Sequence, residues 1–131
     1  MKVEPYLFFN GRCEEAVEFY QRALGAEVAQ LTRFREFPGA PEGLEDKIMH
    51  ADLRIGATRV MASDGDSREA PSFRGFSLAL SAQTDEEADR LFATLGEGGR
   101  VDQPLISTPF ASRFGIVADR FGVSWMVTTS Q

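Results

Sequence analysis

The chain contains one histidine, His50, so any imidazole chemistry in this protein depends on that residue. The stretch 48–55 has the alternating period of a strand, which places His50 on the same face as Asp52. On a face that lines a cavity, the imidazole can act as an acid, a base or an anchor for a ligand. The alternative is a strand histidine that only hydrogen-bonds a neighbour. Glu4 is the second candidate catalytic residue, either as a lone carboxylate at the cavity mouth or as an exposed side chain without a role.

Several other residues can bind or react with a ligand. Arg113 and Arg120 lie near the last strands, where they can hold an anion or pair at the rim with Asp119. Cys13 precedes a helix whose dipole can lower the thiol pKa, although a cysteine there is more often simply part of the helix start. The eleven phenylalanines favour a dense core over an aromatic-lined pocket. If there is such a pocket, its wall can come from Trp125, Phe8, Phe76, Phe110 and Phe114.

Composition excludes several classes of protein. With 20 acidic and 14 basic residues the net charge is -6, so most of the surface would repel nucleic acid and anionic membranes. No run approaches the roughly 20 apolar residues of a membrane span, and the N-terminus lacks the apolar core of a signal peptide. One cysteine cannot form an internal disulfide. We therefore expect a cytoplasmic protein without nucleic acid or membrane partners.

The elements that position these residues follow from hydrophobic periodicity. The first helix is expected over 14–24 and ends at Gly25; the second follows a capping box at 84–87 and ends before Gly96. Pro5 removes a donor from the first strand, which predicts an edge position for that strand. A turn at 119–122 leads into the last strand. The expected strands are 3–9, 28–34, 48–55, 58–63, 73–81, 100–106, 110–118 and 123–128.

The chain repeats itself. The sequence 14–16 of the first helix recurs as 86–88 in the second, and Leu24-Gly25 recurs as Leu95-Gly96. Each half reads strand, helix, strand, strand, strand, and one helix covers only one face of a sheet. We therefore expect an α+β fold in a single domain, 1–131, with two tandem βαβββ modules. The modules, 1–66 and 72–131, would be joined by a linker at 64–71 and form a curved mixed sheet around a shared cavity.

This repeat, together with Phe19-Tyr20 before Leu24-Gly25 and with 119–122 before Trp125, resembles the vicinal oxygen chelate superfamily of glyoxalases, bleomycin-resistance proteins and extradiol dioxygenases. The stretches 5–11, 47–51 and 60–64 are most similar to its PhnB-like branch, often labelled as a 3-demethylubiquinone methyltransferase. The resemblance implies the glyoxalase/bleomycin-resistance fold, a homodimer and a small-molecule cavity. The modules would pair within one chain or exchange across the dimer.

Metal-dependent members of that superfamily bind a divalent ion through His, Glu or Gln of the first and fourth strands of each half. The corresponding residues here are Pro5, Met61, Ser77 and Met126, none of which suits such an ion. We therefore expect no metal site, with Met61 lining the ligand cavity. The glycine-rich stretch 96–99 follows a helix and not a first parallel strand, so it does not predict a site for S-adenosylmethionine.

These observations favour a metal-independent small-molecule binding protein without a cofactor, its aromatic-lined cavity formed by Trp125, Arg113, Phe76, Phe110 and Met61. The alternative is a glyoxalase- or dioxygenase-like enzyme that uses His50 and Glu4, with or without an unconventional divalent metal site. Loss of His50 would abolish turnover in an enzyme and change affinity little in a binder. A third possibility is a structural or regulatory partner with a filled cavity.

Overall fold

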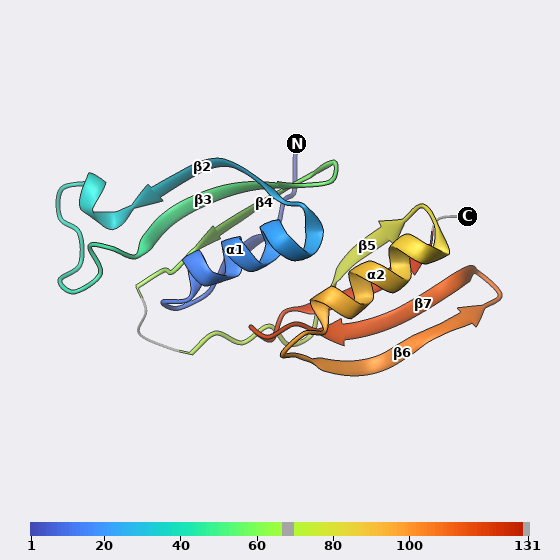
Figure 1. The fold of residues 1–131 in the computed structure, drawn as a ribbon. Coiled ribbons are helices and arrows are strands. Elements are labelled where there is room, and N and C mark those ends of the chain that lie inside the picture. Colours follow the sequence, from blue (N-terminus) through green and yellow to red (C-terminus); the bar gives the residue numbers. More distant parts are fainter. Residues whose placement is uncertain (67–69, 130–131) are drawn as a thin grey trace. The chain divides into compact units, whose positions relative to one another are not determined.

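The computed structural model describes residues 1–66 and 70–129. The chain divides into two compact units, Met1–Pro71 (unit 1) and Ser72–Gln131 (unit 2), and Figure 1 shows a sheet with one α-helix in each. In the described part of the chain no helix is long and apolar enough to cross a membrane. That the two units form one domain stays a prediction.

Unit 1 has a four-stranded mixed sheet with one α-helix packed on it (Figure 1). The strand order is β1-β4-β3-β2, with β1 parallel to β4 and the other pairs antiparallel. β1 is an edge strand, as the proline at position 5 predicted. The elements are β1 (Tyr6–Phe8), α1 (Cys13–Leu24), β2 (Glu27–Arg33), the 3-10 turn η1 (Phe34–Glu36), β3 (Ile48–Ile55) and β4 (Thr58–Ser63).

Unit 2 repeats this plan. Its strand order is β5-β8-β7-β6, with β5 parallel to β8 and the remaining pairs antiparallel. The elements are β5 (Leu78–Ala82), α2 (Asp85–Leu95), β6 (Arg100–Thr108), β7 (Ala111–Ala118) and β8 (Ser124–Thr129). The predicted tandem βαβββ architecture and the α+β class are therefore confirmed.

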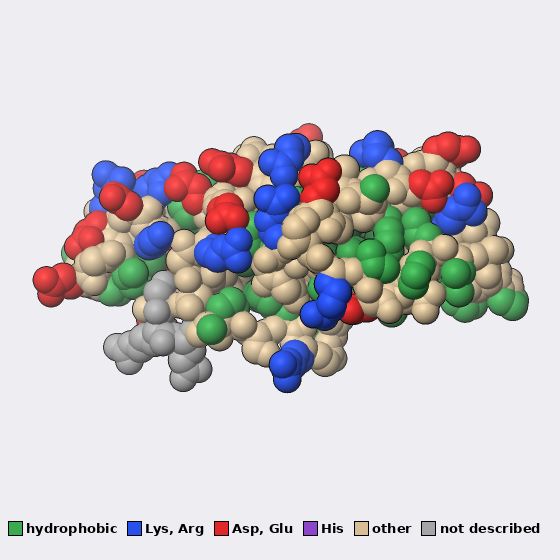
Figure 2. All heavy atoms as spheres, turned by 60° about the horizontal axis from the view of Figure 1, so that its bottom comes forward, with side chains coloured by type: hydrophobic (Ala, Val, Ile, Leu, Met, Phe, Trp, Pro, Cys, Tyr) green, Lys and Arg blue, Asp and Glu red, His purple; other side chains and the backbone are tan. Residues whose placement is uncertain are grey.

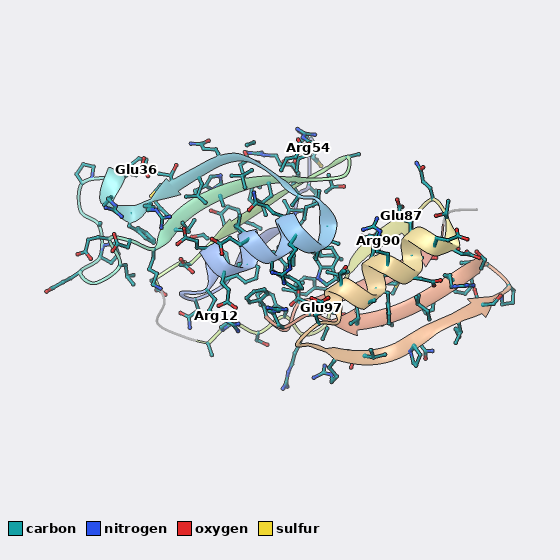
Figure 3. All side chains as sticks on the ribbon, viewed as in Figure 1. Arg12, Glu36, Arg54, Glu87, Arg90 and Glu97 are labelled. Carbon is teal, nitrogen blue, oxygen red and sulfur yellow. The ribbon has the colours of Figure 1, made fainter. Side chains whose placement is uncertain are left out.

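The first helix forms where its apolar stripe predicted it. Ala16, Phe19, Tyr20 and Ala23 are buried on one side, and Gly25 ends the helix with a left-handed φ of 66°. Arg12, labelled in Figure 3, stands at the start of this helix but supplies no side-chain cap.

The cap comes from a residue that the sequence placed in the linker. Asp64 is 2% exposed, and its carboxylate accepts hydrogen bonds from the backbone N–H groups of Gly11, Cys13 and Ile48 at 2.7–2.8 Å. Asp64 is therefore part of unit 1, where it joins the start of α1 to the start of β3. The central linker residues 67–69 lie outside the described residues.

The second helix begins with a variant of the predicted capping box. The Thr84 hydroxyl accepts from the N–H of Glu87, whereas the Glu87 carboxylate accepts from the N–H of Gln83. Glu87 marks this first turn in Figure 3. The helix packs on its sheet at Gly115, where an added Cβ would meet the ring of Phe92 at 2.8 Å.

Several strand boundaries differ from the prediction, most of all at the starts of β1 and β5. β1 begins at Tyr6 because Pro5 has no N–H to donate; only its carbonyl takes part, accepting from Met61. β5 begins at Leu78, several residues later than periodicity indicated. Phe110 belongs to the turn between β6 and β7 and not to a strand.

Candidate functional site

One face of the unit 1 sheet packs under α1 and the other does not. Leu7, Leu53 and Val60 point toward the helix and are 1–4% exposed. Because side chains alternate along a strand, their neighbours point to the opposite face. We call this the open face of unit 1; it carries Glu4, Tyr6, Phe8, His50, Asp52, Arg54, Arg59 and Met61.

Two of these side chains form a hydrogen-bonded pair. The phenol oxygen of Tyr6 lies 2.9 Å from Nδ1 of His50, and the two rings are tilted with centroids 5.6 Å apart. Within residues 1–66 and 70–129, Nε2 of His50 has no hydrogen-bond partner. Partial burial raises the pKa of Tyr6 above its ordinary value, so the phenol keeps its proton at neutral pH. This pair presents one imidazole nitrogen for a ligand.

The charged side chains beside this pair are bound to one another. Nε and Nη2 of Arg59 donate to the two carboxylate oxygens of Asp52 at 2.8 and 2.7 Å, and Nη1 donates to Glu4 at 3.2 Å. The hydrogen bond from Arg59 lowers the pKa of Asp52, and the same contact raises that of Arg59. Glu4 and His50 thus lie on one face, as the catalytic hypothesis requires, but no hydrogen bond joins them in the described chain.

An aromatic surface completes the open face. The rings of Tyr6 and Phe8 stack with centroids 5.0 Å apart and an interplanar angle of 25°. Their side chains are 39% and 53% exposed, although each is large and apolar. Met61 lies directly opposite Tyr6 on β4, and a Cβ at Gly65 would come within 3.1 Å of the Phe8 ring. Glycine at position 65 therefore leaves room for that ring.

The repeat allows a direct comparison with unit 2. Tyr6 pairs with Met61 across β1 and β4, and Ala79 pairs with Met126 across the equivalent strands β5 and β8. The two methionines therefore hold the same place in the two units, while the tyrosine has alanine as its counterpart.

The same register identifies the counterparts of the ion pair. Glu4 and Arg59 correspond to Ser77 and Ser124, whose hydroxyl oxygens lie 2.6 Å apart. A βαβββ unit thus folds with a small neutral pair at these positions. The charged and aromatic groups of the unit 1 open face are not a requirement of the architecture, which favours a role in function.

The other predicted ligand-binding residues lie in unit 2. Trp125, expected in the cavity wall, lies instead in the core at 3% exposure, and its indole N–H donates to Asp119 at 2.9 Å. Arg113 points to the helix side, where it contacts Asp89 at 2.9 Å and Asp85 at 3.5 Å.

Two phenylalanines of the predicted wall are exposed. Phe76 is 47% exposed beside Phe73, and Phe110 is 60% exposed beside Phe114. The sequence analysis did not single out Tyr6, Arg54 or Arg59 of the open face. For Tyr6, its place at the second position after Glu4 on an alternating strand was the available signal.

Cys13 and Arg120 also have defined surroundings. The Cys13 thiol is fully buried, and burial together with the nearby Asp64 carboxylate raises its pKa well above the ordinary value. It is therefore not an activated thiol. Nε of Arg120 donates to the backbone carbonyl of Glu97.

The groups present do not fit a divalent metal ion. In the described ranges no three His, Cys, Asp or Glu side chains are grouped so that they could hold one. On the open face, Glu4 and Asp52 are both engaged by Arg59, and His50 is bonded to Tyr6.

The glycine-rich stretch does not fit a methyl-donor cofactor either. An added Cβ at Gly99 would overlap the carbonyl oxygen of Ala118, so this glycine is required where β6 begins beside the end of β7. Nor does either sheet have the doubly wound parallel form of a nucleotide-binding fold.

Comparison with known proteins gives a consistent family. A family model described as 3-demethylubiquinone-9 3-methyltransferase matches residues 1–128. The chain is 37% identical to the Escherichia coli protein YjdN, over 97% of this chain and 94% of that protein. The protein PA1353 from Pseudomonas aeruginosa is 42% identical in sequence to this chain. Its crystal structure aligns with a TM-score of 0.90 over 100% of this chain and 98% of the PA1353 chain.

Two further solved structures extend the comparison. A Bacillus cereus protein described as a PhnB protein is 30% identical, with a TM-score of 0.85 and coverage of 99% of this chain and 100% of its own. A glyoxalase-related enzyme from Fulvimarina pelagi is 18% identical with a TM-score of 0.61, over 99% of this chain and 88% of its own, and shows the shared fold alone.

Proposed function

This chain belongs to the 3-demethylubiquinone-9 3-methyltransferase family, in the PhnB-like branch of the vicinal oxygen chelate superfamily, and we propose that it binds a small organic molecule on the open face of unit 1 without a metal ion. The observation that carries this proposal is the exposed Tyr6–Phe8 stack beside His50. Exposed aromatic surface next to a few polar groups is the usual composition of a small-molecule site.

The exposure of the Phe8 ring supports the binding of a ligand on this face. Phe8 remains 53% exposed, whereas its β1 neighbour Leu7, on the opposite face of the strand, is 3% exposed. An aromatic ring left in water loses the free energy that burial would supply, about 1.5–3 kcal/mol for a Phe side chain. A ligand that covers this ring would recover part of that free energy.

An enzyme is the second candidate, and the Tyr6–His50 hydrogen bond is the observation that favours it. In the tautomer in which Nδ1–H donates to the Tyr6 oxygen, Nε2 carries the lone pair and can accept a proton from a bound molecule. Glu4 would then act through its ion pair with Arg59, as an electrostatic and positioning group. No step through a metal ion is required.

Substitution of His50 separates the two candidates. His50→Gln keeps a hydrogen-bonding side chain but removes proton transfer. In a binding protein, affinity for a fragment on the open face would fall only a few-fold. In an enzyme, turnover would disappear while fragment binding persists. Full loss of binding in a folded variant would show that the imidazole is the main anchor of the ligand and that the Tyr6–Phe8 stack is not.

The contribution of the Tyr6–Phe8 stack can be tested with a matched control. Phe8→Leu should weaken fragment binding, whereas Phe37→Leu, at 50% exposure in the loop after η1, should leave it unchanged. Equal effects of the two variants would overturn the proposal.

We further propose that the protein is a homodimer in the cytoplasm. The outer edge of β1, unpaired within the unit 1 sheet, supports an assembly that covers it. Sedimentation equilibrium tests the dimer, and cell fractionation tests the location. Phe76 and Phe110 stay the predicted contributions of unit 2 to a ligand wall.

A further inference from the structure

We infer that the ligand of the unit 1 open face is an uncharged, planar aromatic molecule whose hydrogen-bonding group meets Nε2 of His50. This inference rests on the proposed function and adds the ligand's charge and shape. Three observations carry it: the pairing of Arg59 with Asp52 and Glu4, the geometry of the aromatic stack, and the adaptable hydrogen bonding of the Tyr6–His50 pair.

The charges argue against an ionic ligand. The guanidinium of Arg59 donates through Nε and Nη2 to Asp52 and through Nη1 to Glu4. An anion would have to displace one of these carboxylates, and a cation would have to draw a carboxylate away from Arg59. Either exchange loses a charge-assisted hydrogen bond for each one that it forms. An uncharged ligand leaves the ion pairs intact.

Two further cations border this cluster and do not change the balance. Nζ of Lys2 lies 3.9 Å from Glu4 with its side chain 77% exposed, and Arg54, labelled in Figure 3, is exposed opposite Arg59 near the end of β3. Both face water, where a single charge contributes little to binding. Figure 2 shows another face of the molecule, on which acidic and basic side chains are interspersed.

The aromatic pair selects for a flat ligand. Tyr6 and Phe8 alternate along β1 onto the same face, and their rings lie within 25° of parallel. Because the rings stack on each other with centroids 5.0 Å apart, a planar ligand ring can extend this stack on one of its outer faces, with the Met61 side chain nearby on β4.

The Tyr6–His50 pair then selects for a polar substituent. A phenol hydroxyl can either donate to Nδ1 or accept from Nδ1–H, so Nε2 is correspondingly a donor or an acceptor. The pair can therefore satisfy a carbonyl, a hydroxyl or an amide of the ligand without any change of net charge. Tyr6 is in this sense a positioning residue for His50.

The test uses three probes of the same shape that differ in charge: benzamide, benzoate and benzamidine. Each is titrated into the full chain at neutral pH, and binding is followed through the NMR signals of His50 and Tyr6 side chains. We expect benzamide to bind with a dissociation constant at least about tenfold lower than those of the two ions. Tyr6→Phe should weaken benzamide about three- to tenfold, the loss expected for one hydrogen bond.

Controls keep the result interpretable. Ser77→Ala and Ser124→Ala change the equivalent positions of unit 2 and should not alter benzamide binding. Thermal unfolding confirms that each variant is folded. If benzoate or benzamidine binds more tightly than benzamide, the inference is wrong while binding on the open face stands. If none of the three perturbs His50 or Tyr6 at high millimolar concentration, both the inference and the proposed function are overturned.

Discussion

The phenol oxygen of Tyr6 and Nδ1 of His50 are 2.9 Å apart although 44 positions separate the residues in the chain. The sheet order brings them together, because β1 lies parallel to β4 and β4 lies antiparallel to β3. Their contact is thus a product of topology, and it gives unit 1 a polar group that unit 2 lacks at the equivalent positions.

Asp64 should be among the largest single contributors to the stability of unit 1. Its buried carboxylate accepts three backbone N–H groups, and Asp64→Asn removes the charge and turns one acceptor into a donor. We expect the free energy of unfolding to fall by about 2–4 kcal/mol in urea denaturation. Asp46→Asn, at a side chain that is 80% exposed, should cost less than about 1 kcal/mol. Equal losses would contradict the capping role.

The buried thiol of Cys13 predicts a loss of stability at alkaline pH. The pKa of Cys13 in the folded chain is raised above its ordinary value of 9.0, chiefly by burial. The unfolded state therefore gains thiolate first, so this contribution to stability is complete below pH 9.0 and declines as the pH rises beyond it. Urea unfolding of the native chain and of Cys13→Ala, measured from pH 7 upward, should show a smaller alkaline decline in the variant.

A thiol reagent gives an independent readout for the same residue. Modification of Cys13 should be slow in the native chain and fast in denaturant. Rapid modification without unfolding would contradict its burial.

The Asp52–Arg59 contact predicts the opposite dependence at acid pH. Arg59 lowers the pKa of Asp52 below its ordinary value of 3.8, so the contact stabilises the fold above that pH. The stabilisation is lost as the pH falls below 3.8 through the lowered pKa. Asp52→Asn should therefore flatten the acid limb of a plot of unfolding free energy against pH. An unchanged acid limb would show that the ion pair does not form in solution.

The local periodicity of the sequence was enough to predict most elements. The helices and β3, β4 and β7 fall within a residue or so of their predicted bounds, because each depends on neighbours in the chain. Asp64 was misread as linker since its Gly- and Ser-rich surroundings hide a contact with the start of α1.

Facing directions were harder to predict than elements. Alternation places Trp125 and Met126 on opposite faces of β8, but it does not say which face α2 covers. Trp125 lies on the covered face, in the core. Tyr6 was missed because its partner belongs to a strand two steps away in the sheet.

Gly99 offers a test of whether the glycine-rich stretch serves packing or a cofactor. Gly99→Ala places a Cβ against the Ala118 carbonyl and should destabilise the chain by about 3 kcal/mol. Gly96→Ala is the control, because a Cβ at Gly96 would lie 3.3 Å from the nearest atom and the residue already has a right-handed φ of −77°. A cofactor role would appear as lost S-adenosylmethionine binding in a stably folded Gly99→Ala variant.

The most direct test of the account uses the two equivalent methionines as reporters. Met61 and Met126 hold the same place in unit 1 and unit 2, opposite Tyr6 and Ala79 respectively. Their side-chain methyl groups can be labelled with carbon-13 and followed by NMR while benzamide is added. The account predicts a saturable shift of the Met61 methyl signal that Tyr6→Phe weakens, and a smaller shift or none at Met126. A shift confined to Met126, with Met61 unchanged, would contradict the assignment of the ligand site to unit 1.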